Sequence, residues 1–268
     1  LKKHRSGARI GHDTAYDHMF LDGLEDAYEE GRAMGTFAQE TANEYQLTRE
    51  EMDDYSIESL RRANAAIESG AFDGEVVPVT IVTRKGETTV EHDEAPGKGK
   101  PDKIPQLRPA FAKDGTITAA TSSSISDGAA AVVLSRESVA KENGQMPVAK
   151  IVGLAAHAQE PSEFTVAPVG AINKLLEQTG WSADDVDLWE VNEAFACVAM
   201  FAMRDIGIPH DKINVNGGGT ALGHPIGASG TRIIVTLLNA LKQQGKKRGI
   251  ASLCIGGGEA TAVAVEMV

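Results

Sequence analysis

Turn residues and runs of apolar positions divide the chain into expected helices and strands. Thr48 and Glu51 have the spacing of a capping box, which predicts that a helix begins there and ends near Gly70. Pro168 near the start and Gly180 just past the end frame a second helix. The residues after position 227 form a long amphipathic helix. The expected helices therefore cover residues 48–69, 168–178, 193–204 and 228–244.

Short apolar segments predict the strands. Two of them, residues 76–83 and 87–91, are joined by a turn at residues 84–86, and residues 129–134 are typical of a buried strand. Residues 1–35 are irregular, and residues 95–109 have the Pro, Gly and Lys content of a long loop. From residue 146 strands alternate with helices, which predicts a layered α/β domain. Its expected strands are residues 148–156, 186–191, 249–255 and 260–267.

Composition narrows the classes of protein. The chain has 268 residues, of which 42% are hydrophobic, enough for a real core. Its net charge of -12 argues against a nucleic-acid partner. We find no apolar run of membrane-spanning length and expect no membrane partner. Two cysteines are too few for a disulfide framework or a four-cysteine metal site, and they fit a cytoplasmic protein. The polar start at Leu1 has no signal core, so we expect a chain cut from a longer protein.

Three segments that follow expected strands carry candidate chemistry, namely residues 192–196, 216–230 and 254–258. Such turns gather at one edge of an α/β sheet, where active sites lie. His224 stands in a Gly-rich turn, as a general base or as a helix cap. Cys254 ends an apolar strand, as a reactive thiol or as a core cysteine. Asn192 is suited to hold a water or a carbonyl oxygen, or to cap a helix. The residues alone leave these alternatives open.

Together these segments resemble one family. Asn-Glu-Ala-Phe-Ala at 192–196, Gly-His-Pro-Ile-Gly-Ala-Ser-Gly at 223–230 and Cys-Ile-Gly-Gly-Gly at 254–258 have the order and spacing of the thiolases. The likeness extends to residues 34–35, 107–111 and 126–131, and it is greatest to the acetyl-CoA acetyltransferase branch. It implies a thiolase-like layered α/β fold (an αβαβα half) with an irregular α+β loop domain. By this likeness residues 1–124 are the loop domain, 125–145 end the N-terminal half, and 146–268 form the C-terminal domain.

The resemblance also implies a reaction, the condensation of two acetyl-CoA molecules to acetoacetyl-CoA and the reverse thiolysis. His224 would activate a nucleophilic cysteine and, with a water held by Asn192, hydrogen-bond a thioester oxygen. Cys254 would exchange a proton with the second acetyl group, and the amide of Gly256 would hold the acyl-enzyme oxygen. No residue here matches the family's nucleophilic cysteine, so we expect the C-terminal two-thirds of a thiolase, inactive by itself. We expect no metal and no cofactor, with coenzyme A as substrate and product.

The likeness assigns further residues to the substrate. The expected coenzyme A contacts are Ser123, Ala119, Phe111 and Lys98. The expected acyl-pocket residues are Met34 and Phe195. Ala33, Phe164 and Glu259 depart from the usual pattern beside this pocket, which leaves the acyl-chain preference open. The alternatives are a longer-chain 3-ketoacyl-CoA thiolase and a catalytically incomplete CoA-binding fragment; a ketoacyl-ACP synthase fits the motifs less well. Thiolases also lead us to expect a homo-oligomer, a dimer or a tetramer.

Overall fold

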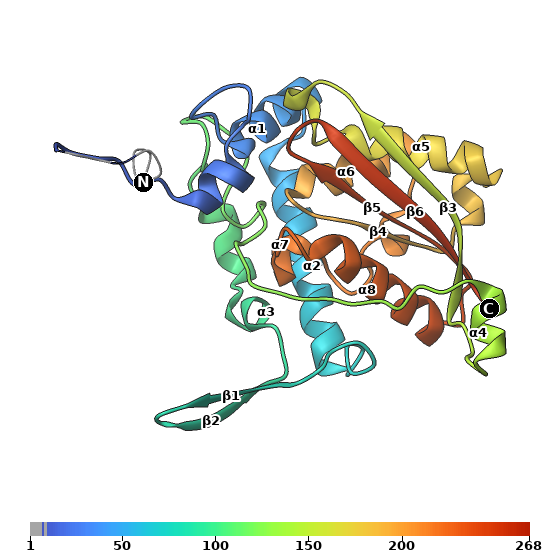
Figure 1. The fold of residues 1–268 in the computed structure, drawn as a ribbon. Helices are drawn as coiled ribbons and strands as arrows, with labels where there is room; N and C mark the ends of the chain where they lie inside the picture. Colours follow the sequence, from blue (N-terminus) through green and yellow to red (C-terminus); the bar gives the residue numbers. More distant parts are fainter. Residues whose placement is uncertain (1–6, 8–9) are drawn as a thin grey trace.

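The computed structural model describes residue 7 and residues 10–268, so the polar start at Leu1 lies outside the described residues. Its centre is a mixed four-stranded sheet (Figure 1) with the order β3-β6-β5-β4. The strands are β3 (Ala149–Ala158), β4 (Leu188–Val191), β5 (Arg248–Ile255) and β6 (Glu259–Met267). β4 and β5 run parallel, whereas β6 is antiparallel to both β3 and β5.

Helices cover both faces of this sheet (Figure 1). One face packs on α5 (Ala167–Thr179) and α6 (Ala196–Ile206), and the other on α8 (Ser229–Gln243). Side chains alternate along a strand, so Ile250 lies in the first core and Ala251 in the second. The α/β fold class expected from the alternation of strands and helices is confirmed.

The N-terminal half of the chain adds two long helices to the first core. α1 (Met34–Glu44) and α2 (Arg49–Glu68) contribute Phe37, Met52 and Tyr55 to it. The hairpin of β1 (Val79–Thr83) and β2 (Gly86–Val90) projects from the body, with every residue exposed (Figure 1). The remaining helices are short: η1 Phe20–Leu24, α3 Glu94–Lys98, η2 Pro101–Gln106, α4 Glu137–Glu142, η3 Pro161–Glu163, η4 Ala183–Asp185, η5 His210–Lys212 and α7 Gly219–Leu222.

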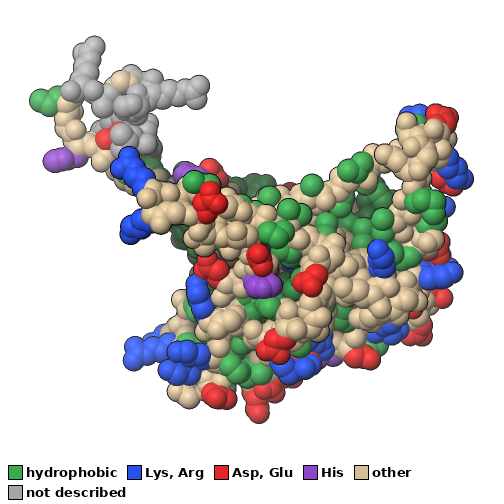
Figure 2. Space-filling model, turned by 90° about the horizontal axis from the view of Figure 1, so that it is seen from below, with side chains coloured by type: hydrophobic (Ala, Val, Ile, Leu, Met, Phe, Trp, Pro, Cys, Tyr) green, Lys and Arg blue, Asp and Glu red, His purple; other side chains and the backbone are tan. Residues whose placement is uncertain are grey.

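Most expected elements are confirmed, including the capping box at Thr48 and the left-handed Gly180 after α5. The expected buried strand at 129–134 is wrong. Val133 is 94% exposed, and the segment is extended without strand structure. Apolar residues form a buried strand only if other strands and helices cover them, and the described residues supply no strand beside this one. Figure 2 likewise shows hydrophobic side chains on the surface of the face seen from below.

Two further expectations need correction. The expected loop at 95–109 contains the end of α3 and all of η2, which has Pro101 in its first turn. The helix expected from residue 193 begins only at Ala196. Phe195 is extended because it pairs with Ser122 in a β-bridge before the helix starts. The division into residues 1–124, 125–145 and 146–268 stays a prediction.

None of the helices in the described part of the chain has the length and apolar character needed to cross a membrane.

The capping box gives a test of α2. The Thr48 hydroxyl accepts from the Glu51 amide, and the Glu51 carboxylate accepts from the Thr48 amide at 2.8 Å. These bonds satisfy donors that the helix itself leaves unpaired. We expect Thr48→Ala to lower the free energy of unfolding in urea by about 1 kcal/mol. Thr48→Ser keeps the oxygen and is expected to retain most of the stability.

The same box predicts a pH dependence. Hydrogen bonds from the Thr48 amide and hydroxyl hold the pKa of Glu51 below its ordinary value. Its stabilisation is present above the ordinary glutamate pKa and is lost as the pH falls through the lowered one. The difference between wild type and Thr48→Ala therefore shrinks in acid. A difference that grows in acid would contradict this assignment.

Candidate active site

Two of the three predicted turns meet in the structure. Asn192 directly follows β4, and its side-chain nitrogen lies 3.4 Å from Nε2 of His224. The Asn192 amide donates to the Ser252 carbonyl of β5 at 3.0 Å, so strand pairing sets the position of Asn192. The side chain is buried, and its Oδ1 has no hydrogen-bond partner among the residues that the structure describes. A buried, unpartnered oxygen beside an imidazole is suited to bind a water or a ligand donor.

The His224 ring is fixed by Ser229, the first residue of α8. The Ser229 hydroxyl donates to the Pro225 carbonyl at 3.0 Å, and its oxygen lies 2.5 Å from Nδ1 of His224. Because the Ser229 hydroxyl proton is used in the bond to Pro225, the ring proton must lie on Nδ1, which donates a hydrogen bond to the Ser229 oxygen. Nε2 is then the basic nitrogen and points toward Asn192. In this tautomer Nε2 of His224 carries no proton and can accept one.

Burial controls the charge of His224. Burial, and then Arg232, lower the pKa of His224 to about 4. The imidazole is therefore neutral near pH 7, as a general base requires. The preceding Gly223 has a φ of +97°, and a Cβ there would lie 2.1 Å from Oγ of Ser126. Only glycine at position 223 allows this turn to bring His224 so close to residues 124–126.

Cys254 lies at the same edge of the sheet. Asn192 touches β5 at Ser252, and Cys254 comes two residues further along that strand. Its side chain belongs to the core that also contains Ile250 and α6, and 8% of it is exposed. Burial raises the pKa of Cys254 to about 12, so the thiol is protonated at rest. It is thus a proton donor at rest and a strong base once ionised.

The predicted oxyanion glycine and acyl-pocket residues are neighbours. A Cβ at Gly256 would lie 2.7 Å from the sulfur of Met34, which places Met34 against this turn. The ring of Phe111 packs on Gly35, beside Met34, and meets the ring of Phe195 edge-on at 5.9 Å. Phe164, assigned no role from the sequence, meets Phe195 at 6.4 Å. These residues form an apolar wall.

The predicted coenzyme A contacts are less closely associated. Ser123 is near the site, because its amide donates to the Ala194 carbonyl at 3.0 Å while the Ser124 carbonyl accepts from the His224 amide. Ala119 is exposed. Lys98 is exposed on α3, and its ammonium is paired with Glu94 at 2.5 Å rather than with another predicted site residue. These coenzyme A roles stay predictions.

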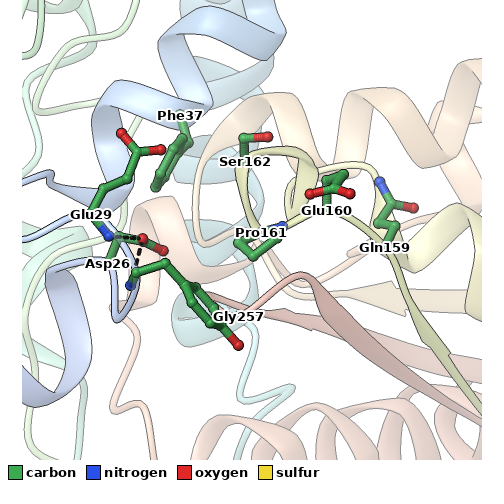
Figure 3. Close-up of a pocket in the computed structure, with 9 residues that line it drawn as sticks. Asp26, Glu29, Phe37, Gln159, Glu160, Pro161, Ser162 and Gly257 are labelled. Carbon is green, nitrogen blue, oxygen red and sulfur yellow. Dashed lines mark hydrogen bonds between the residues drawn. The ribbon is translucent and has the colours of Figure 1, made fainter.

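Two hollows flank the glycine turns. The one in Figure 3 has a volume of about 440 Å³ and is lined by Gly257, three carboxylates and apolar side chains. Asp26 in its wall accepts from the amides of Tyr28 and Glu29. The second, of about 430 Å³, lies between residues 126–130 and 225–228. No predicted catalytic side chain lines the first, whereas Pro225, next to His224, lines the second.

Comparison with known proteins settles the family. A model of the thiolase N-terminal domain matches residues 1–138, and a model of the thiolase C-terminal domain matches residues 145–267. The chain belongs to the thiolase family. Since both thiolase domain models match, the expectation that only the C-terminal two-thirds of a thiolase is present is not borne out.

Relatives and solved structures agree with this membership. An acetyl-CoA acetyltransferase of Yarrowia lipolytica is 47% identical over 262 residues, which are 98% of this chain and 65% of that protein. The crystal structure of the Bacillus anthracis acetyl-CoA acetyltransferase superposes with a TM-score of 0.95 at 42% identity, covering 100% of this chain and 68% of that one. A thiolase from Ascaris suum in complex with coenzyme A gives 0.88 at 39% identity, over 98% and 67%. The chain thus spans about two-thirds of the length of these thiolases.

The neutral His224 gives a test of the site. We expect its ring signals in NMR to titrate near pH 4 in the folded chain and near the ordinary 6.5 in the chain unfolded by urea. A folded-state value near 6.5 would contradict the burial described above.

Stability must follow the same shift. Between pH 6.5 and 4 the unfolded chain binds a proton at His224 that the folded chain does not, so stability falls as the pH falls, by on the order of 3 kcal/mol. His210 also has a pKa lowered by burial, so the comparison is between wild type and His224→Gln. The variant is expected to lose part of the slope.

Proposed function

We propose that this chain carries the proton-transfer and oxyanion-binding part of an acetyl-CoA acetyltransferase. The observation that carries the proposal is the contact between Asn192 and a neutral His224 at the edge of the sheet where Cys254 lies near the end of β5. The names of the relatives support the short acyl substrate. The substrates are acyl-CoA thioesters, and coenzyme A is released.

His224 serves the first half of the reaction. Nε2, free of a proton, accepts the proton of a thiol that attacks the thioester carbonyl. The ring then carries a proton on both nitrogens, and Nε2–H donates to the oxygen that gains negative charge. As the thioester C–S bond breaks, the ring passes this proton to the departing coenzyme A sulfur. Ser229 keeps the ring oriented while the proton moves. Asn192, beside Nε2, holds a water as the second donor.

Cys254 serves the second half. The carbon next to a thioester is a very weak acid, so a stronger base gains more driving force for removing its proton. Burial makes the Cys254 thiolate such a base. In condensation the thiolate removes a proton from the methyl carbon of acetyl-CoA, and in thiolysis the thiol returns one to the product. The Gly256 amide holds the acyl oxygen.

The acyl group itself needs another thiol. The pKa values of both Cys197 and Cys254 are raised by burial. A protonated, enclosed thiol is a poor nucleophile toward a thioester. We therefore propose that the acyl-accepting cysteine is supplied by residues outside this sequence.

This division of labour predicts the behaviour of the purified chain. We expect no thiolysis of acetoacetyl-CoA by the 268-residue chain alone, measured as loss of substrate in the presence of CoA. Turnover by the chain alone would refute it. Where turnover is found in a longer protein, comparison with longer 3-ketoacyl-CoA substrates identifies the chain-length preference.

The two cysteines form a matched pair for a second test. In a protein that contains this chain and the acyl-accepting thiol, Cys254→Ala is expected to abolish condensation while labelled acetyl-CoA still acetylates the protein. Cys197→Ala, an equal deletion in the same core, is expected to keep both activities. Equal loss of acetylation and condensation in Cys254→Ala would count against the role of Cys254 as the carbon base.

A further inference from the structure

Glu193, next to Asn192, is a buried carboxylate with an unusual set of partners. None of its surface is exposed, yet the ion pairs in the described part of the chain include none to it. Neutral groups donate to it instead, two to Oε1 and three to Oε2. The donors to Oε1 are Tyr55 Oη (2.8 Å) and Asn214 Nδ2 (2.8 Å). The donors to Oε2 are Ser59 Oγ (2.8 Å), Thr220 N (3.1 Å) and Thr220 Oγ1 (2.7 Å).

These donors come from separate segments. Tyr55 and Ser59 lie one turn apart on α2, and Thr220 belongs to α7, four residues before His224. The guanidinium of Arg62, also on α2, donates to backbone carbonyls at residues 213 and 214. A carboxylate taken out of water without a cation is stable only if hydrogen bonds replace its hydration. The hydrogen bonds of Glu193 therefore hold only while α2, α7 and the segment of Asn214 stay together around it.

The glycine run before His224 fits closely around this carboxylate. A Cβ at Gly218 would lie 2.3 Å from the Glu193 carboxyl carbon, and one at Gly219 would lie 2.7 Å from the Glu193 carbonyl oxygen. Gly217 has a φ of +80° and would meet the Ser59 carbonyl at 2.7 Å. The Gly218 amide donates to the Ser59 hydroxyl at 3.0 Å, which in turn donates to Glu193. The turn thus rests on α2 through Ser59.

We propose that Glu193 is a positioning residue that holds the turn bearing Asn192 and the turn bearing His224 against α2. Its carboxylate belongs to the first turn and accepts from Thr220 of the second. The contact of Asn192 with His224 at 3.4 Å therefore depends on donors from α2, which lie more than 130 positions before Glu193 in the sequence. The role in catalysis rests on the proposed acyl-transfer function, whereas the positioning of His224 does not.

Two serines on α2 give a matched test. Ser59 and Ser56 are both buried, but Ser59 bonds Glu193 and Gly218, while the Ser56 hydroxyl has no partner. We expect Ser59→Ala to let the turns separate and admit water, which returns the pKa of His224 in NMR by at least about one unit toward its ordinary value. Ser56→Ala is expected to leave it unchanged, and Ser59→Thr, which keeps the hydroxyl, to preserve it.

The outcome separates positioning from simple stabilisation. A Ser59→Ala chain that melts at a lower temperature but keeps the His224 titration of wild type would overturn the proposal. If Ser59→Ala does not fold, Tyr55→Phe removes only a hydroxyl that donates to Oε1 and is expected to shift His224 in the same direction. An unshifted His224 in folded Tyr55→Phe would then overturn it.

Kinetics test the catalytic part. In a protein with acetoacetyl-CoA thiolysis, Ser59→Ala is expected to lower kcat about tenfold, the loss of one hydrogen bond to a charged group, with KM within twofold of wild type. Equal kcat values for Ser59→Ala and Ser56→Ala would overturn the catalytic consequence. If a protein that contains this chain and the acyl-accepting thiol shows no turnover, the proposed function fails, yet the NMR comparison of the two serines still decides the positioning of His224.

Discussion

Close contact between a glycine turn and a buried carboxylate is the constraint on which the site depends. Residues 217–219 approach Glu193 and α2 to distances that leave no room for a Cβ. Strand pairing places the backbone of Asn192, because its amide donates to the Ser252 carbonyl of β5. It does not place His224, which belongs to a segment outside the sheet. The turn obtains its position from packing and hydrogen bonds to a helix of the N-terminal half.

Burial without neutralising partners gives the site its chemical character. His224 is kept neutral and Cys254 protonated by the same physical cause, removal from water, although the two pKa values move in opposite directions. For His224 the nearby charge of Arg232 adds to the effect of burial on the pKa. Burial therefore prepares one base for a thiol proton and another for a carbon proton.

Much of this was open to prediction from the sequence. The helix at Thr48 follows from local chemistry alone, and the family motifs led to the pairing of Asn192 with His224. The buried strand expected at residues 129–134 was wrong because burial depends on what lies beside a segment and not only on its own side chains. Glu193 was overlooked for a similar reason. An acidic residue in a turn is usually solvated, and its donors Tyr55 and Ser59 lie more than 130 positions away. The three consecutive glycines at 217–219 were the sequence feature that could have indicated a close backbone contact here.

The exposure of the hairpin of β1 and β2 affects where the molecule unfolds locally. Its residues are all exposed, and its strands pair only with each other among the described residues. Two strands by themselves are marginally stable in water. The hairpin can therefore unzip without disturbing either core, and its amides should exchange with deuterium ahead of those in the central sheet. For the same reason, a protease would first cut here and leave the catalytic edge intact.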